Sequence, residues 1–170
     1  MQQKYIYAAA PPERTEAMKL TRYTDYALRV LMHLAARPER LSSISEIARS
    51  YGISQNHLMK VVHDLRKEGF VASVRGRSGG IRLGRPPAEI GVGEVVRYTE
   101  EGFDLGQCGT CRFAPACGLN GVLGEALSAF MAVLDRYSLA DLVESRSEAL
   151  RGFLFPVAAP TGVEGAAPSV

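Results

Sequence analysis

The chain has 170 residues, of which 46% are hydrophobic and 22% are charged, and its formal net charge at pH 7 is +2. This composition lies within the range of an ordinary globular domain and excludes collagen-like, mucin-like and largely disordered chains. The sequence contains no apolar run long enough to span a membrane, and its first residues lack the pattern of a signal peptide. We therefore expect a cytoplasmic protein with no membrane association.

Charge is distributed unevenly along the chain. Residues 49–85 carry eight basic and two acidic side chains, whereas residues 86–170 carry five basic and eleven acidic ones. A dense basic segment is typical of a protein that binds a polyanion, because each phosphate contact releases condensed counterions. The charge pattern indicates nucleic acid as a partner, with a solvated arginine-rich surface as the alternative.

The N-terminal part predicts an extension followed by a helix. Residues 1–17 show no sustained apolar period and contain Pro11 and Pro12, so we expect a flexible segment outside the fold. From residue 18 onward, apolar side chains recur every three or four residues. This period predicts an amphipathic helix that ends before Pro38.

The next segment predicts a helix-turn-helix. Ser43 and Glu46 have the spacing of a capping box, and Gly52 ends the helix that they begin. A third helix begins after Ser54, an N-cap residue, and ends before Gly69. The second helix of such a motif lies in the major groove of DNA. We expect DNA contacts from Ser54, Gln55, Asn56, His57 and Lys60. A plain three-helix bundle with a polar outer face is the alternative.

A glycine-rich turn follows the third helix. Residues 70–74 and 80–83 are short strand-like runs, and the turn between them carries Arg75 and Arg77. Arginines at the tip of a hairpin beside a recognition helix are placed to enter the minor groove. The sequence therefore predicts a DNA-binding wing, although the glycines alone require only a tight turn.

The C-terminal half predicts two more helices. A short helix is expected at residues 93–98, and a longer one carries an apolar seam. The seam residues step by three and four positions, and they are Leu119, Leu123, Ala126, Phe130, Val133 and Tyr137. A seam of this length favours a homodimer over packing against the protein's own body. Residues 152–170 read as a flexible tail.

The three cysteines lie together, just before the long helix. Cys108, Cys111 and Cys117 supply soft thiolate ligands, which suit an iron–sulfur cluster or zinc. Both kinds of site ask for four ligands, and no histidine follows Cys117. An iron–sulfur cluster with a fourth ligand from elsewhere, a zinc site and a thiol switch remain open on this evidence.

Several segments resemble the iron–sulfur winged-helix transcription regulators, the family that includes IscR and the nitric-oxide-sensing repressors. The resemblance covers residues 18 to about 145 and is carried by MKLTRYTDYALRVLMHLAA, ISQNHLMKVVHDLRKEGFV, VRGRSGGIRLGRP, CGTC and APACGL. It implies a mainly α fold with a small β-hairpin, namely a winged helix-turn-helix plus a long dimerisation helix. It also implies a homodimeric repressor that binds a double-stranded DNA operator. Nitric oxide, as the effector, would nitrosylate its cluster and release genes of nitric oxide detoxification.

The resemblance also implies a ligand set. It assigns the cluster to Cys108, Cys111 and Cys117, although the first cysteine gap is shorter here than is usual in the family. IscR-like members use a histidine three residues after the last cysteine, and Asn120 stands there instead. Nitric-oxide-sensing members use an aspartate of the other subunit, which corresponds to Asp25. This set implies a 4Fe-4S cluster, with 2Fe-2S as the alternative. Asp25 also suits a residue that complements the helix dipole.

The expected organisation has five parts. They are an extension at 1–17, a winged helix-turn-helix domain at 18–101, a cluster-binding loop at 102–118, a dimerisation helix with a following short helix at 119–151, and a tail at 152–170. A winged-helix regulator that senses oxidants or cluster status through thiols, zinc or a 2Fe-2S cluster is the alternative function. An enzyme is not expected, because the sequence contains no nucleotide-binding glycine loop and His33 and His63 occur singly.

Overall fold

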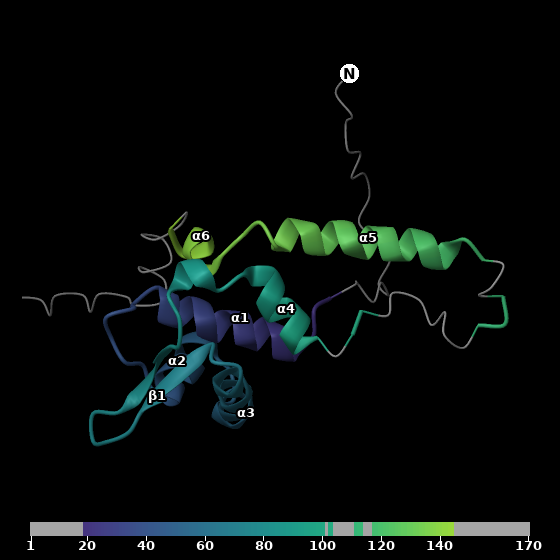
Figure 1. Cartoon of the computed structure of the whole chain (residues 1–170). Coiled ribbons are helices and arrows are strands. Elements are labelled where there is room, and N and C mark those ends of the chain that lie inside the picture. Colours follow the sequence, from purple (N-terminus) through teal and green to yellow (C-terminus); the bar gives the residue numbers. More distant parts are fainter. Residues whose placement is uncertain (1–18, 101, 104–110, 114–116, 145–170) are drawn as a thin grey trace, which may run out of the picture.

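The structure is a computed structural model that describes residues 19–100, 102–103, 111–113 and 117–144. Its elements are α1 (Arg22–Ala35), α2 (Ile44–Tyr51), α3 (Gln55–Lys67), β1 (Val71–Val74), β2 (Gly80–Leu83), the 3-10 helix η1 (Pro87–Glu89), α4 (Val92–Thr99), α5 (Leu119–Leu134) and α6 (Leu139–Glu144) (Figure 1). The fold is mainly helical with one small antiparallel hairpin, as predicted. The expected extension, the expected tail and Cys108 lie outside the described residues. No helix in the described ranges is long and apolar enough to cross a membrane.

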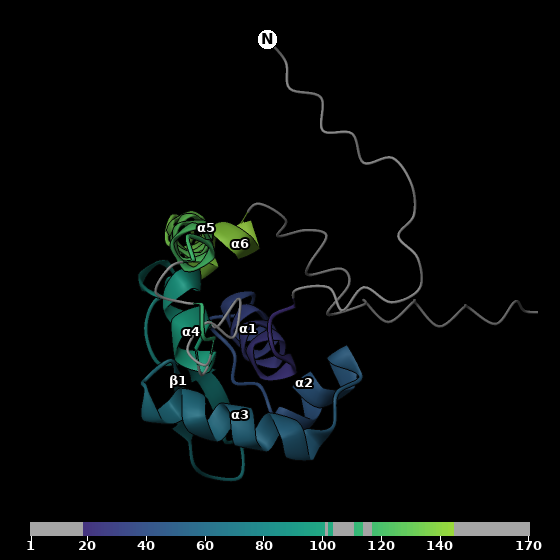
Figure 2. The ribbon, with the colours of Figure 1, turned by 90° about the vertical axis from the view of Figure 1, so that its right-hand side faces the viewer.

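Helix α1 forms the centre of the body. It begins at the N-cap residue Thr21, whose hydroxyl accepts a hydrogen bond from the backbone N–H of Thr24 at 3.2 Å. Its apolar stripe is fully buried at Ala27, Val30 and Leu31. Helices α3, α4 and α6 all pack against it. In Figure 2, α3 and α5 lie on opposite sides of α1 and α4.

The helix-turn-helix forms as predicted, with two corrections at its caps. The Ser43 hydroxyl accepts from the backbone N–H of Glu46 at 3.1 Å, but the Glu46 carboxylate pairs with Arg40 at 3.2 Å instead of completing the capping box. Gly52 ends α2 in the left-handed conformation, with φ at 63°. Ser54 occupies the N-cap position of α3, yet its exposed side chain makes no capping hydrogen bond.

The hairpin pairs Val71 with Leu83 and Val74 with Gly80. Its inner end is fastened to the body, because the backbones of Ser42 and Ile81 exchange two hydrogen bonds of 2.9 and 3.0 Å. A Cβ atom at Gly80 would lie 2.9 Å from the Ser42 carbonyl oxygen, so only glycine allows this close approach. The root of the wing is therefore fixed, while its tip projects away from the body (Figure 1).

After α5 the chain returns to the body. The backbone N–H of Leu139 donates to the Ile90 carbonyl at 2.9 Å, and that of Val92 donates to the Tyr137 carbonyl at 2.8 Å. Leu139 is fully buried in the core that α1 and α3 share. Helix α6 is thus packed with the winged helix-turn-helix, although it follows α5 in the chain.

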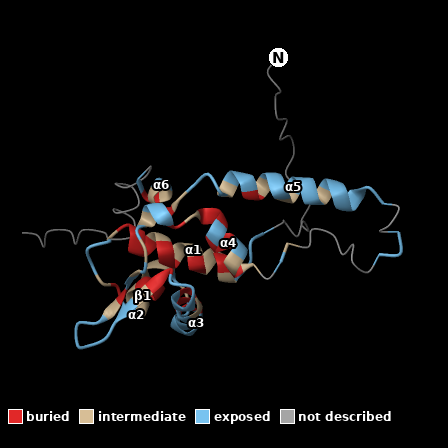
Figure 3. Ribbon diagram, viewed as in Figure 1, coloured by how far each residue is buried: buried red, intermediate tan, exposed pale blue. Residues whose placement is uncertain are grey.

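Helix α5 is shorter than the predicted seam. It ends at Leu134, so Tyr137 lies beyond the helix and not on its face. Met131 is the one buried residue of α5 within this chain. Figure 3 shows the rest of α5 as exposed or half-buried, extending past the body. Apolar residues remain uncovered on it, with 54% of Leu119, 62% of Val122 and 45% of Val133 exposed.

Candidate DNA-binding surface and cysteine segment

Helix α3 presents a polar face away from the core. Leu58 and Leu65 are fully buried on its inner side. The side chains predicted to reach DNA, Gln55, Asn56, His57 and Lys60, are all exposed, as is Ser54 just before the helix. At 3.6 residues per turn, Asn56 and Lys60 lie almost opposite Leu58. The outer face of α3 is therefore available to a ligand.

Other exposed residues of α3 include His63 and Met59. His63 is exposed, and it follows Lys60 by three positions, so both occupy the outer face with Asn56. The same helical period could have assigned His63 to this face from the sequence. Met59 is 45% exposed beside it, and a thioether there can contact a thymine methyl group.

His57 differs from the other outer residues. Its ring stacks on that of Tyr26 in the first turns of α1, with ring centroids 6.5 Å apart and an interplanar angle of 23°. This contact holds His57 on the flank of α3 that faces α1. The structure thus separates His57 from Asn56, which sequence analysis placed together.

The wing carries its arginines at the tip. Arg75 and Arg77 are exposed in the turn between β1 and β2, and Gly76 between them has φ at 125°. No ion pair in the described part of the chain involves Lys60, Arg75 or Arg77. Helix α3 and the wing therefore offer uncompensated positive charge on the side of the body opposite α5 (Figure 2).

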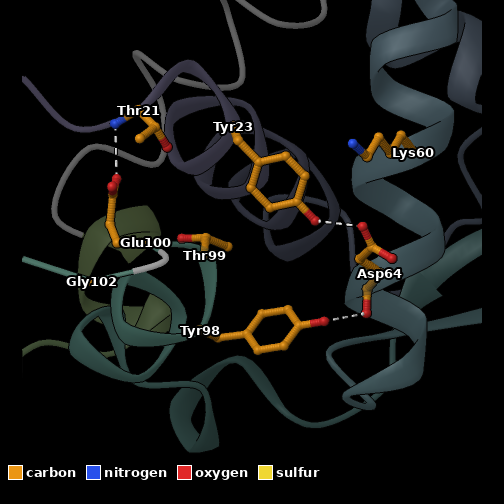
Figure 4. A pocket seen from close by; sticks show the side chains of 8 residues that line it. All are labelled: Thr21, Tyr23, Lys60, Asp64, Tyr98, Thr99, Glu100 and Gly102. Carbon is orange, nitrogen blue, oxygen red and sulfur yellow. Dashed lines mark hydrogen bonds between the residues drawn. The ribbon is translucent and has the colours of Figure 1, made fainter.

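A hydrogen-bonded junction joins α3 to α1 and α4. The Tyr23 hydroxyl donates to Asp64 Oδ2 at 2.9 Å, and the Tyr98 hydroxyl donates to the Asp64 carbonyl oxygen at 3.1 Å. The backbone N–H of Thr21 donates to Glu100 Oε1 at 2.8 Å. Figure 4 shows these groups around a pocket of about 520 Å³. The junction connects the start of α1 and the end of α4 to the recognition helix.

The charge of Asp64 is stabilised at this junction. Hydrogen bonds from Lys67 and then from Tyr23 lower the pKa of the Asp64 carboxyl group. Burial, followed by the bond to Asp64, raises the pKa of the Tyr23 hydroxyl, so this hydroxyl stays a donor. At neutral pH the Asp64 carboxylate is therefore charged, and the Tyr23 hydroxyl keeps its proton and donates to it.

The cysteine segment precedes α5. Cys111 and Cys117 are exposed and form no disulfide, and Cys117 lies directly before Gly118, the N-cap of α5. Cys108 lies outside the described residues. Within the described ranges, no three histidine, cysteine or acidic side chains gather into a metal-binding group. The structure thus presents two accessible thiols but does not bring them together with Asp25 in one chain.

Asp25 lies in the first turn of α1. Its side chain is 43% exposed and pairs with Arg29, one turn further along α1, at 2.9 Å. This pair is compatible with the helix-start role that the sequence left open for Asp25. The carboxylate is also accessible enough to reach a ligand outside this chain.

Comparison with known proteins supports the DNA-binding interpretation of α3 and the wing. Residues 20–145 match the Rrf2 family, described as "Iron-dependent Transcriptional regulator". The HTH-type transcriptional regulator NsrR of Bacillus subtilis (strain 168) is 53% identical over 140 residues, which cover 79% of this chain and 96% of that protein. NsrR of Shouchella clausii (strain KSM-K16) is 48% identical over 143 residues, covering 81% and 95% of the two chains.

Solved structures share the fold. T. potens IscR superposes with a TM-score of 0.65 at 30% identity, over 78% of this chain and 91% of that one. The global cysteine regulator CymR of B. subtilis gives a TM-score of 0.62 at 27% identity, over 75% and 98% of the two chains. The hairpin beside α3 is thus the wing of a winged helix-turn-helix. The chain belongs to the Rrf2 family of transcriptional regulators and is a DNA-binding member of it.

Proposed function

We propose that this protein is a repressor that senses nitric oxide through an iron–sulfur cluster and releases promoters of nitric oxide detoxification genes when the cluster is nitrosylated. The observation that carries the proposal is the pair of exposed, unbridged thiols of Cys111 and Cys117 beside α5, in a chain about half identical to regulators named NsrR. Such a repressor acts where the chromosome is, so we propose a cytoplasmic location.

Cys108, Cys111 and Cys117 would hold the cluster, and Asp25 of the partner subunit would be the fourth ligand. Accessible thiols of this kind fit an iron–sulfur centre, because soft thiolates are its usual ligands. The bound cluster supplies iron that reacts with nitric oxide. We propose a 4Fe-4S cluster, with 2Fe-2S as the alternative. A carboxylate oxygen is a harder ligand than thiolate, so Asp25 would hold the iron less tightly than the cysteines would.

The homodimer would form through α5. Leu119, Val122 and Val133 leave apolar surface uncovered on a helix that extends past the body (Figure 3). A second copy of α5 would cover this surface. Two recognition helices could then reach successive major grooves, about 34 Å apart on one side of the duplex.

The dimer interface is testable by one charge. Val122→Glu places a carboxylate on the uncovered face without touching the core, because Val122 is 62% exposed within the chain. Sedimentation should show a monomer, and circular dichroism should show unchanged helix content. Glu125→Gln on the same helix should stay dimeric. A Val122→Glu dimer of wild-type affinity would exclude this face.

The junction at Asp64 gives the cluster state a route to DNA. Glu100 directly follows α4 and precedes the cysteine segment in the sequence. Its carboxylate accepts a hydrogen bond from the backbone N–H of Thr21, just before α1. Tyr23 and Tyr98 connect these two helices to Asp64 on the recognition helix. A shift of the cysteine segment or of Asp25 would therefore move groups that hold α3.

Anaerobic DNA binding tests the proposal directly. Protein purified without oxygen should be brown and contain iron and acid-labile sulfide, and stoichiometric nitric oxide should release its DNA. Tight DNA binding by protein that contains no labile sulfide would exclude the cluster mechanism. Asp25→Ala should retain sulfide but alter nitric-oxide-sensitive release, with Glu39→Ala, an exposed residue after α1, as the matched control. Unchanged spectra and unchanged release in Asp25→Ala would remove Asp25 from the ligand set.

The alternative is a regulator that senses oxidants or cluster status through thiols, zinc or a 2Fe-2S cluster. The exposure of both described thiols also favours direct oxidation. A thiol or zinc protein would be colourless and would lose DNA binding with peroxide or a chelator. Iron and sulfide counts on the same anaerobic sample separate the thiol and zinc forms of this alternative from the cluster mechanism.

A further inference from the structure

A shallow groove lies between the first turns of α1 and the flank of α3. Its volume is about 290 Å³. It is lined by Arg22, Tyr23, Tyr26, His57, Lys60 and Val61. Arg22, Tyr26, His57 and Lys60 carry hydrogen-bond donors, the Tyr23 hydroxyl already donates to Asp64, and none of the lining side chains is acidic. The groove thus combines mostly apolar walls with the nitrogen donors of Arg22, His57 and Lys60, and sequence analysis did not identify it.

The acidic side chains nearest the groove are already engaged. Asp64 accepts from Tyr23 at 2.9 Å and from Lys67 at 3.0 Å. Asp25 is paired with Arg29 at 2.9 Å. The described part of the chain contains no ion pair to Arg22, and this side chain is exposed. Arg22 and Lys60 therefore have no ion-pair partner within the described residues, while the Asp64 carboxylate keeps its own charge beside Lys60.

The position of His57 points to the kind of anion. His57 is one residue from Leu58, so it lies about 100° around the helix from the buried face, whereas Asn56 lies about 160° from it. Stacking on Tyr26 holds the His57 ring on this flank. The major groove is about 12 Å wide, close to the diameter of a helix with its side chains. The outer face of a helix in the groove meets base edges, and its flanks face the sugar–phosphate backbones.

We propose that the α1–α3 groove binds a backbone phosphate of DNA, with Arg22 and His57 as its ligands and Lys60 at its rim. The proposal rests on the DNA-binding function above and deepens it. It gives α1 a direct contact with the operator. It also makes His57 a phosphate ligand that fixes the register of α3, instead of a residue that reads bases.

Salt dependence and sequence discrimination test the site. The variants are Arg22→Ala and His57→Phe, which keeps a ring against Tyr26 but removes both ring nitrogens. Arg136→Ala, at an exposed position after α5, is the matched control. Each protein is titrated with two duplexes, one selected from a randomised pool by the wild-type protein and one of scrambled sequence, at several salt concentrations.

Each substitution should weaken the binding of the two duplexes by the same factor. Loss of one phosphate contact should lower the slope of log K against log salt by about 0.9 for Arg22→Ala. The defect of Arg22→Ala should then shrink about threefold between roughly 50 and 200 mM salt. Arg136→Ala should match the wild type in affinity and slope.

Three outcomes would overturn the proposal. If both variants bound DNA with the salt slope and affinity of the wild type, the groove would not bind a phosphate of DNA. A loss confined to the selected duplex in His57→Phe would make His57 a base-reading residue. Saturable binding of inorganic phosphate, abolished by Arg22→Ala with DNA affinity unchanged, would assign the site to the free anion. Failure of the wild-type protein to bind any duplex would instead refute the DNA-binding function itself.

Discussion

Removal of one hydroxyl group tests whether the junction at Asp64 holds the recognition helix. Tyr23→Phe keeps the ring in place and deletes the 2.9 Å bond to the Asp64 carboxylate. A hydrogen bond to a charged group contributes about 1.5–3 kcal/mol. Because the Asp64 side chain is 23% exposed and keeps Lys67 at 3.0 Å, we expect a loss below this range, about 1 kcal/mol. For a chain of this size that loss lowers Tm by about 2–4 °C.

The loss should depend on pH in a defined direction. Hydrogen bonds from Lys67 and Tyr23 lower the pKa of Asp64 in the folded state. A depressed folded-state pKa stabilises the fold at pH values above the pKa of the unfolded chain, which is about 3.9 for aspartate. This stabilisation disappears as the pH falls through the folded-state pKa. The Tm difference between wild type and Tyr23→Phe should therefore persist from neutral pH to about pH 5 and fade below about pH 4.

Thermal unfolding at fixed protein concentration is the assay, because dimerisation makes Tm depend on concentration. Tyr26→Phe is the matched control, since it removes a hydroxyl from the same turns of α1 but keeps the ring stacked on His57. Equal Tm values for Tyr23→Phe and the wild type at neutral pH would refute the reasoning. A difference that grew on acidification would refute the assignment of Asp64 as the charged acceptor.

Three further outcomes follow from local contacts. Ser43→Ala removes the cap of α2 and should cost about 1 kcal/mol in denaturant unfolding, whereas Ser43→Thr should cost much less. Gly93→Ala places a methyl group against the Asp135 carboxylate and should cost about 1–2 kcal/mol in the same measurement, because this carboxylate must move. Replacing both Arg75 and Arg77 by alanine should lower the salt slope of DNA binding by about 1–2 without changing Tm, and an unchanged slope would exclude the wing from DNA.

Much of the fold could be predicted from the sequence, because its signals are local. The apolar period places α1 and α3, Gly52 ends α2 in the left-handed conformation, and the two runs around the glycine-rich turn form the hairpin. Each signal depends on residues within a few positions of one another. The spacing of the three cysteines is equally local, and it indicates metal or thiol chemistry without any tertiary structure.

Only the tertiary structure decided how these elements use their surfaces. Tyr23 and Tyr98 meet Asp64 across 41 and 34 positions, and no local pattern predicts such pairs. The helical period alone places His57 on the polar face with Asn56, but its ring stacks on Tyr26 and lies on the flank beside α1. Periodicity reports which side of one helix is apolar, whereas the neighbour that each flank meets depends on how helices pack. The sequence therefore determined the recognition helix, and packing decided which of its residues are exposed on its outer face and which lie on the flank beside α1.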